Sequence, residues 1–346
     1  MVFLQSLNHW KSHRFPSWEE LCDQVHVLTL PMRVKFRGVN KREIIIFRGP
    51  AGWGEFSPFT EYQPAEAASW LLAGIEAAWL GFPEPARQTV PVNATLPAVA
   101  PEQVESVLSS YRGEIKELKI KVAEKGQSLA EDIARLRLAR QLLPTAGLKV
   151  DANMGYTHQQ AVQALEAFEE FDLLYAEQPV ASVEGLAQLR EEMRNRGLST
   201  LIAADESVRK AEDPLRVARW GAADLLVVKA APLGGVRSAL AICEEAGLPA
   251  VISSALDSSV GISMGLALAA SLPELPFGCG LATVSLMQED VTANSLIAHN
   301  GEIQVGKVVP DAHRLTRLAA PSERRAWWLA RLRTCYDLLA AELGRL

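Results

Sequence analysis

Polar and ionisable side chains end five successive apolar runs in the middle of this 346-residue sequence. The residues are Lys119 and Lys121, Asp151 and Asn153, Glu177, Asp205 and Glu206, and Lys229. Such side chains are rarely buried unless they are paired, so the pattern indicates a shared site. Three neighbouring carboxylates need a compensating charge, and an open set of oxygen ligands suits Mg²⁺ better than Ca²⁺ or Zn²⁺. The sequence therefore predicts a Mg²⁺ site on Asp151, Glu177 and Asp205.

Lysines at both ends of this series have a role that fits such a site. A divalent cation on a substrate carboxylate acidifies the neighbouring C–H group, and a neutral lysine can accept that proton. The second lysine can hold negative charge or take the proton from the opposite face. We expect Lys121 and Lys229 to be catalytic, supported by Lys119, Asn153 and Glu206. A purely structural salt-bridge network of the same residues is the alternative.

The apolar runs belong to a repeating unit with a period of about 25 to 30 residues, and most gaps between them have helical periodicity. We expect eight strands, at 90–95, 118–122, 148–152, 173–177, 201–205, 225–229, 250–254 and 276–280. This pattern predicts a (β/α)8 barrel, in which chemistry lies at the C-terminal strand ends. Lys121 on the second strand and Lys229 on the sixth would then face each other. An open doubly wound sheet would normally carry a glycine-rich phosphate turn after its first strand, and none is found.

Both ends of the chain depart from this repeat. We expect strands at Val25–Leu30 and Glu43–Phe47, helices at Pro64–Leu80 and Ser322–Leu346, and a hairpin in 295–305 around Asn300-Gly301. The prediction is an α+β capping domain from residues 1–88 and 290–346, with the barrel at 89–289. Residues 1–23 are expected to be a loosely attached extension.

Composition excludes several classes of protein. The net charge is −6 and no polybasic block occurs, which argues against nucleic-acid and anionic-membrane partners. No apolar run approaches the ~20 residues that cross a bilayer, and the N-terminus lacks a signal-peptide pattern. The four scattered cysteines favour a reducing compartment over a disulfide framework or a zinc site. We therefore expect a cytoplasmic protein that acts on a small molecule.

The strand-end motifs also resemble those of a known family. They are similar to the motifs of the muconate-lactonising subgroup of the enolase superfamily, where lysine or histidine bases act with Mg²⁺. The motifs are K-I-K at 119–121, D-A-N at 151–153, E-Q-P at 177–179, A-D-E-S at 204–207 and Lys229 before P-L-G-G. The likeness to o-succinylbenzoate synthases of the actinobacterial type rests on 36–38 (FRG), 52–59 (GWGEFSPF), 253–262 (SSALDSSVGI) and 280–283 (GLAT). The resemblance covers nearly all of the chain beyond about residue 24.

This resemblance implies a modified (7+1) barrel, a Mg²⁺ cofactor and a carboxylate substrate. The implied reaction is dehydration of 2-succinyl-6-hydroxy-2,4-cyclohexadiene-1-carboxylate to o-succinylbenzoate in menaquinone biosynthesis. Lys121 would remove the proton next to the carboxylate and then help hydroxide leave from the same face. Lys229 would stabilise the intermediate from the other face or act as the proton acceptor. The expected substrate contacts are Arg37, Ser57, Ser254 and Gly280, with a surface salt bridge as the alternative for Arg37.

Two other activities and one inactive class stay open at this point. N-succinylamino acid racemases and dipeptide epimerases share the metal and lysine set. Epimerases usually carry D-x-D after the eighth strand, and the stretch 280–285 (GLATVS) lacks it. A catalytically silent binding barrel would have no reason to keep five polar strand ends.

Overall fold

A curled parallel sheet forms the centre of the computed structural model, which describes residues 10, 12–36, 38–209 and 214–345. Its seven strands follow the order β11-β10-β9-β8-β7-β6-β5. They are β5 (Ala94–Leu96), β6 (Glu117–Lys121), β7 (Gly147–Asp151), β8 (Leu173–Glu177), β9 (Leu201–Ala204), β10 (Leu225–Val228) and β11 (Ala250–Ile252). Neighbours in the sheet are neighbours in sequence, as a βα repeat requires.

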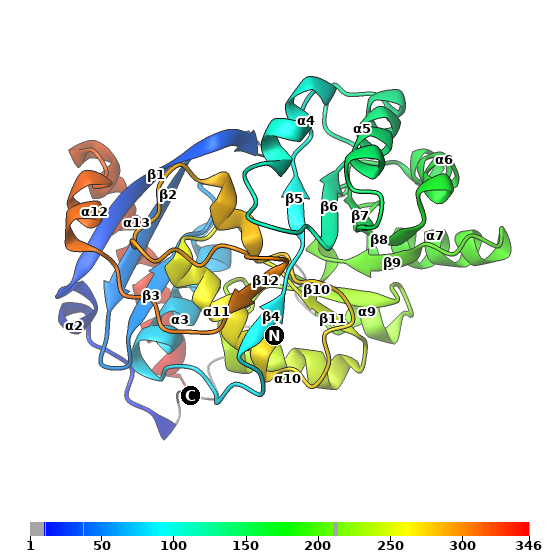
Figure 1. The fold of residues 1–346 in the computed structure, drawn as a ribbon. Helices are drawn as coiled ribbons and strands as arrows, with labels where there is room; N and C mark the ends of the chain where they lie inside the picture. The colour runs from blue at the N-terminus through cyan, green and yellow to red at the C-terminus, as the bar shows by residue number, and fades with distance from the viewer. Residues whose placement is uncertain (1–9, 11, 37, 210–213, 346) are drawn as a thin grey trace.

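Helices fill most of the connections and lie outside the sheet (Figure 1). They are α4 (Pro101–Leu108), α5 (Leu129–Leu142), α6 (His158–Phe168), α7 (Val183–Asn195), the short α8 (Glu206–Arg209) and α9 (Arg216–Arg219), α10 (Val236–Ala246) and α11 (Ser259–Ser271). Capping boxes fix the start of two of them, with Ser128 and Glu131 at α5 and Thr157 and Gln160 at α6.

Single bridges close the ring where a regular eighth strand was predicted. Cys279 pairs in parallel with Val92, and Gly280 pairs in parallel with Ser253. The N–H of Gly280 donates to Ile252 O at 2.7 Å. A Cβ atom at Gly280 would lie 2.6 Å from Ser253 Oγ, so a larger residue here would force the Ser253 hydroxyl to move. The barrel prediction is confirmed, whereas the eighth strand at 276–280 is shortened to these bridges.

A cap built from both chain ends covers the barrel, as predicted. Strands β1 (Val25–Phe36), β2 (Val39–Arg48) and β3 (Trp53–Phe56) form an antiparallel sheet in that order. Helix α3 (Pro64–Trp79) packs on β3 and on the C-terminal helix α13 (Ser322–Leu343). Figure 1 shows the blue N-terminal strands and the red C-terminal helix on the same side of the molecule. The fully buried Trp328 of α13 lies edge-on to Phe56, with ring centroids 6.0 Å apart.

Two predictions for the chain ends need correction. Residues 12–23 are attached rather than loose, because helix α2 (Trp18–Cys22) buries Leu21 completely and Tyr336 donates to Pro16 O at 2.8 Å. The tight turn at Asn300-Gly301 is present, with φ of 51° and 74°. The following strand β12 (Glu302–Gln304) pairs with β4 (Thr89–Pro91) instead of forming a long hairpin.

Shorter elements complete the described part of the chain. They are the 3-10 helices η2 (Glu169–Phe171) and η3 (Ala282–Leu286) and the helix α12 (Ala312–Arg317). Within the described ranges, every helix is either too short or too polar to span a lipid bilayer.

Candidate active site

Three of the predicted residues stand side by side where strands β6, β7 and β8 end. The strand register pairs Lys121 with Asp151, and Asp151 with Glu177. Glu177 pairs in turn with Ala203 of β9, two residues before Asp205. Because side chains alternate along a strand, Asp205 continues the same row on the inner face. The βα repeat thus places three carboxylates along one wall of the barrel mouth.

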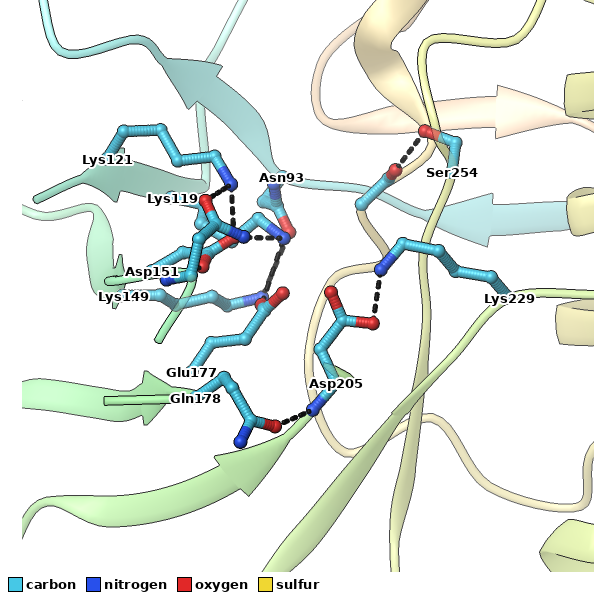
Figure 2. A network of polar contacts seen from close by, with 12 residues as sticks. Asn93, Lys119, Lys121, Lys149, Asp151, Glu177, Gln178, Asp205, Lys229 and Ser254 are labelled. Carbon is cyan, nitrogen blue, oxygen red and sulfur yellow. Dashed lines mark hydrogen bonds and ion pairs between the residues drawn. The ribbon is translucent and has the colours of Figure 1, made fainter. Parts of the chain in front are cut away.

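Lysine side chains contact this wall from two sides, and Figure 2 shows Lys119 and Lys121 opposite Lys229. Lys119 Nζ lies 2.9 Å from Glu177 Oε2 and 3.7 Å from Asp151 Oδ2. Lys121 forms an ion pair with Asp151 and donates to Asn153 Oδ1 at 2.8 Å. Lys229 Nζ lies 2.5 Å from Asp205 Oδ1. All three ammonium groups therefore interact with the predicted metal ligands.

Burial makes the charges of this site interact strongly. All three carboxylates are at most 2% exposed. Burial and the neighbouring Asp151 charge raise the pKa of Glu177 to about 7, against the opposing effect of Lys119. For Asp151, burial is outweighed by Lys121 and Lys119, which hold its pKa well below the usual range. For Asp205, burial is likewise outweighed by Lys229 and Arg209, so its pKa falls to about 2. Glu177 is therefore the carboxylate whose negative charge is least compensated.

Two unpaired oxygens show how the site fits a cation. Glu177 Oε1 and Glu206 Oε2 are buried without a hydrogen-bond partner. Among residues 10, 12–36, 38–209 and 214–345, however, no three acidic, histidine or cysteine side chains are gathered into a ready-made metal site. Each of the three lysine ammonium groups instead pairs with one of the carboxylates. The donor set has the oxygen chemistry that Mg²⁺ prefers, and a cation bound here would compete with the ammonium groups for the same oxygens.

Sequence reasoning missed two residues that fix the acid row. Arg209 donates to Asp205 Oδ1 at 3.1 Å and to Glu206 Oε1 at 2.7 Å, and it also reaches the hydroxyl of Tyr62 from the cap. Its position four residues after Asp205, on one turn of helix, was the available signal. Gln178 Oε1 accepts the N–H groups of Asp205 and Ser207 at 3.0 and 3.1 Å. It orders the chain just after β9.

A deeper polar layer was also missed. Lys149, two residues before Asp151 on β7, is completely buried. Its Nζ lies 2.5 Å from Glu117 Oε2 and donates to Gly278 O at 2.6 Å. No strand-end rule finds this residue, because it lies in the barrel interior below the acid row.

The pocket above the acids has one wall from the cap and one from the barrel. Phe36, Phe59 and Trp70 line it from the cap, and Ser253–Leu256, Gly280 and Thr283 line it from the barrel. Ser254 Oγ donates to Gly280 O at 2.7 Å and lies 2.9 Å from Thr283 Oγ1.

Of the four predicted substrate contacts, Ser254 and Gly280 line the pocket. Ser57 does not, because its buried hydroxyl donates to Glu55 Oε1 at 2.8 Å. Arg37 lies outside the described residues.

Family models and solved structures match both parts of this architecture. Residues 101–312 match the model described as "Enolase C-terminal domain-like", and residues 27–78 match "Enolase N-terminal domain-like". A muconate lactonizing enzyme from Pseudomonas fluorescens superposes with a TM-score of 0.72 at 20% identity, covering 86% of this chain and 98% of that one. A 2-chloromuconate cycloisomerase from Rhodococcus opacus gives 0.71 at 22% identity over the same shares. At these identities the superpositions establish the fold.

Curated relatives define the family more closely. An o-succinylbenzoate synthase of Mycobacterium leprae is 50% identical over 330 residues, covering 95% of this chain and 96% of the relative. The o-succinylbenzoate synthase of Mycobacterium marinum is 50% identical over 327 residues, covering 94% of this chain and 97% of the relative. That of Mycobacterium tuberculosis is 49% identical over 330 residues, covering 95% of this chain and 98% of the relative. The chain belongs to the enolase superfamily and, within it, to the family of these o-succinylbenzoate synthases.

Proposed function

We propose that this protein is a carbon–oxygen lyase that dehydrates 2-succinyl-6-hydroxy-2,4-cyclohexadiene-1-carboxylate to o-succinylbenzoate in menaquinone biosynthesis. The observation that carries the proposal is the identity of about half the residues with o-succinylbenzoate synthases over 95% of the chain. The site supports it, because three buried carboxylates stand between lysines that approach from two sides. A silent binding barrel would gain nothing from such a costly cluster of buried charge.

We propose that Mg²⁺ is the cofactor and that Asp151, Glu177 and Asp205 hold it. The unpaired Glu177 Oε1 and the raised pKa of this carboxyl support the assignment, because both indicate missing positive charge. When bound, Mg²⁺ would withdraw electron density from the substrate carboxylate and so acidify the neighbouring C–H group. Asn153 and Glu206 would support the site, since Asn153 Nδ2 donates to Glu206 Oε1 at 3.3 Å.

Lys121 and Lys229 divide the proton and charge transfers of the reaction between them. Lys121 Nζ, in its neutral form, takes the proton next to the substrate carboxylate, and Asn153 Oδ1 holds the resulting ammonium. The C–O bond then breaks, and the departing hydroxide takes the same proton from Lys121 on the same face. Water leaves, Lys121 is neutral again, and the ring has become aromatic. Lys229 stabilises the negative charge from the opposite face, and Lys119 adds positive charge beside Glu177.

The direct test is formation of o-succinylbenzoate by the purified protein with Mg²⁺. EDTA should abolish the reaction and added Mg²⁺ should restore it. Lysines on both faces would also allow a proton to be exchanged at Cα of an N-succinyl amino acid, so incubation in heavy water tests the racemase alternative. Product formation without deuterium exchange supports a dedicated synthase, whereas exchange without product would replace the proposal by the racemase.

Three further assignments complete the proposal. The partner of the site is a small carboxylate rather than a nucleic acid or a membrane, in keeping with the net charge of −6. The four scattered cysteines support a cytoplasmic location. The capping domain comprises residues 1–88 and 290–346, and the catalytic barrel comprises residues 89–289.

A further inference from the structure

Two irregular segments face each other across the pocket. The cap segment Ser57–Phe59 follows β3, and its Phe59 ring lines the pocket. The barrel segment Ser253–Leu256 follows β11 and forms the opposite wall. Because neither segment belongs to a regular helix or strand, contacts between the cap and the barrel are needed to hold each of them in place.

Arg42 of β2 joins these two segments. Its Nη2 donates to the carbonyl of Ser57, and its Nε donates to the carbonyl of Leu256 at 3.2 Å. Its Cζ also lies 4.6 Å from the centroid of the Phe59 ring. The side chain is buried, with 3% exposure, and does not itself line the pocket. Since both acceptors are main-chain carbonyl oxygens, the guanidinium group fixes the backbone on both walls of the pocket.

The barrel segment needs such support because its backbone is strained. Leu256 has φ of 61°, a left-handed conformation that costs a branched residue free energy. The Asp257 carboxylate accepts the N–H of Ala255 at 3.1 Å and shapes the turn from within. From the cap, Glu55 accepts the hydroxyl of Ser57 at 2.8 Å and the N–H of Gly261 at 3.1 Å. Arg42 thus binds the cap to the barrel segment, and Glu55 binds it to the start of the following helix α11.

We propose that Arg42 is a positioning residue that sets the width of the substrate pocket by holding the cap segment Ser57–Phe59 against the barrel segment Ser253–Leu256. The identity of the substrate rests on the proposed function, whereas the connection between the two walls does not. An arginine fork reaches both carbonyls at once, and a lysine ammonium has no such fixed geometry. Arg42→Lys therefore keeps the charge and loosens one or both walls.

A second arginine provides the matched control. Arg237 of α10 also bridges barrel and cap, donating to Glu76 Oε1 at 2.8 Å and to Gly81 O at 2.9 Å, and it does not line the pocket. The loss of one hydrogen bond from a charged group corresponds to a factor of about ten or more in an equilibrium constant. Arg42→Lys should therefore raise the KM for the dehydration substrate by about tenfold or more and leave kcat within about twofold. Arg237→Lys should leave both constants unchanged. Equal KM values in the two variants would overturn the proposal.

Hydrogen exchange tests the same claim without turnover. Arg42→Lys should speed amide exchange in 57–60 and 255–258, and Arg237→Lys should not. If the wild type makes no product, the proposed function fails and this comparison still decides the role of Arg42. If Arg42→Lys does not fold, amide hydrogen exchange in the wild-type protein decides the role of Arg42. Two segments that are held by one side chain should open together and exchange at the same rate. Independent opening of the two segments would contradict the proposal.

Discussion

Replacing Glu177 by glutamine should make the metal-free protein more stable and the enzyme inactive. The Glu177 carboxyl has an ordinary pKa of 4.5 and a folded-state pKa of about 7, raised by burial and by Asp151. A raised folded-state pKa means that stability is fully present below pH 4.5 and is lost as the pH rises towards 7. That difference corresponds to about 3 kcal/mol at pH 8, or roughly 4 °C in Tm for a chain of this length. Glutamine removes the ionisation and can still accept the hydrogen bond from Lys119, whose ammonium group keeps the Asp151 carboxylate at 3.7 Å as a charge partner.

Thermal unfolding in EDTA at pH 8 and at pH 5 gives the measurement. Other buried acids titrate in both proteins, so the difference between variant and wild type isolates Glu177. Glu177→Gln should melt higher than the wild type at pH 8, and the gap should shrink at pH 5. The same variant should lose the Mg²⁺-dependent rise in Tm, and its formation of o-succinylbenzoate should fall by about 100-fold or more.

A matched control is Glu117→Gln, at the other end of the barrel interior. Glu117 pairs with the fully buried Lys149 at 2.5 Å, so glutamine leaves that ammonium without its charge partner. This variant should melt lower than the wild type and keep its response to Mg²⁺. A Glu177→Gln variant that is also destabilised at pH 8 would refute the view that the negative charge of Glu177 is poorly compensated in the metal-free protein.

Three other outcomes follow from the same geometry. Lys121→Ala should lower turnover by about 10²- to 10⁴-fold with the far-UV circular dichroism unchanged, and near-normal turnover would show that another group is the base. After dialysis against EDTA, Mg²⁺ should restore more activity than an equal concentration of Ca²⁺, and equal recovery would contradict the assignment of the ion. Trp328→Ala removes a fully buried ring that contacts Phe56 and donates to Glu43 Oε2 at 3.1 Å, so it should cost about 3–5 kcal/mol in urea unfolding. A loss below about 1 kcal/mol would mean that α13 does not stabilise the cap.

Local sequence patterns were sufficient to predict most of the barrel and the residues at its strand ends. From β6 to β11, each strand is a short, largely apolar run that ends at or directly before a polar residue, and both signals lie within a few neighbouring positions. The eighth strand was one exception, because ring closure at Cys279 and Gly280 depends on pairing with Val92 and Ser253 from other parts of the chain. The predicted first strand at 90–95 was another, because it is divided between β4, which pairs with β12, and the barrel strand β5. A single sequence gives no sign of such a partner.

The residues that hold the site in place were harder to predict for the same reason. Arg42 and Leu256 are 214 positions apart, and Arg209 and Tyr62 are 147 apart. No periodicity connects residues at such separations. Ser57 does not line the pocket, because its motif gave the residue types of the cap segment, while the direction of its hydroxyl depends on Glu55. Residue type thus predicted the chemistry, and tertiary packing decided which side chains reach the pocket.

The central claim is that Asp151, Glu177 and Asp205 jointly bind one divalent cation between opposed lysines. A crystal structure of the protein with Mg²⁺ and o-succinylbenzoate tests it most directly. We predict one Mg²⁺ in contact with an oxygen of each carboxylate, the product carboxylate beside it, and Lys121 and Lys229 on opposite faces of the product ring. A cation bound elsewhere, or both lysines on one face of the product, would contradict the account.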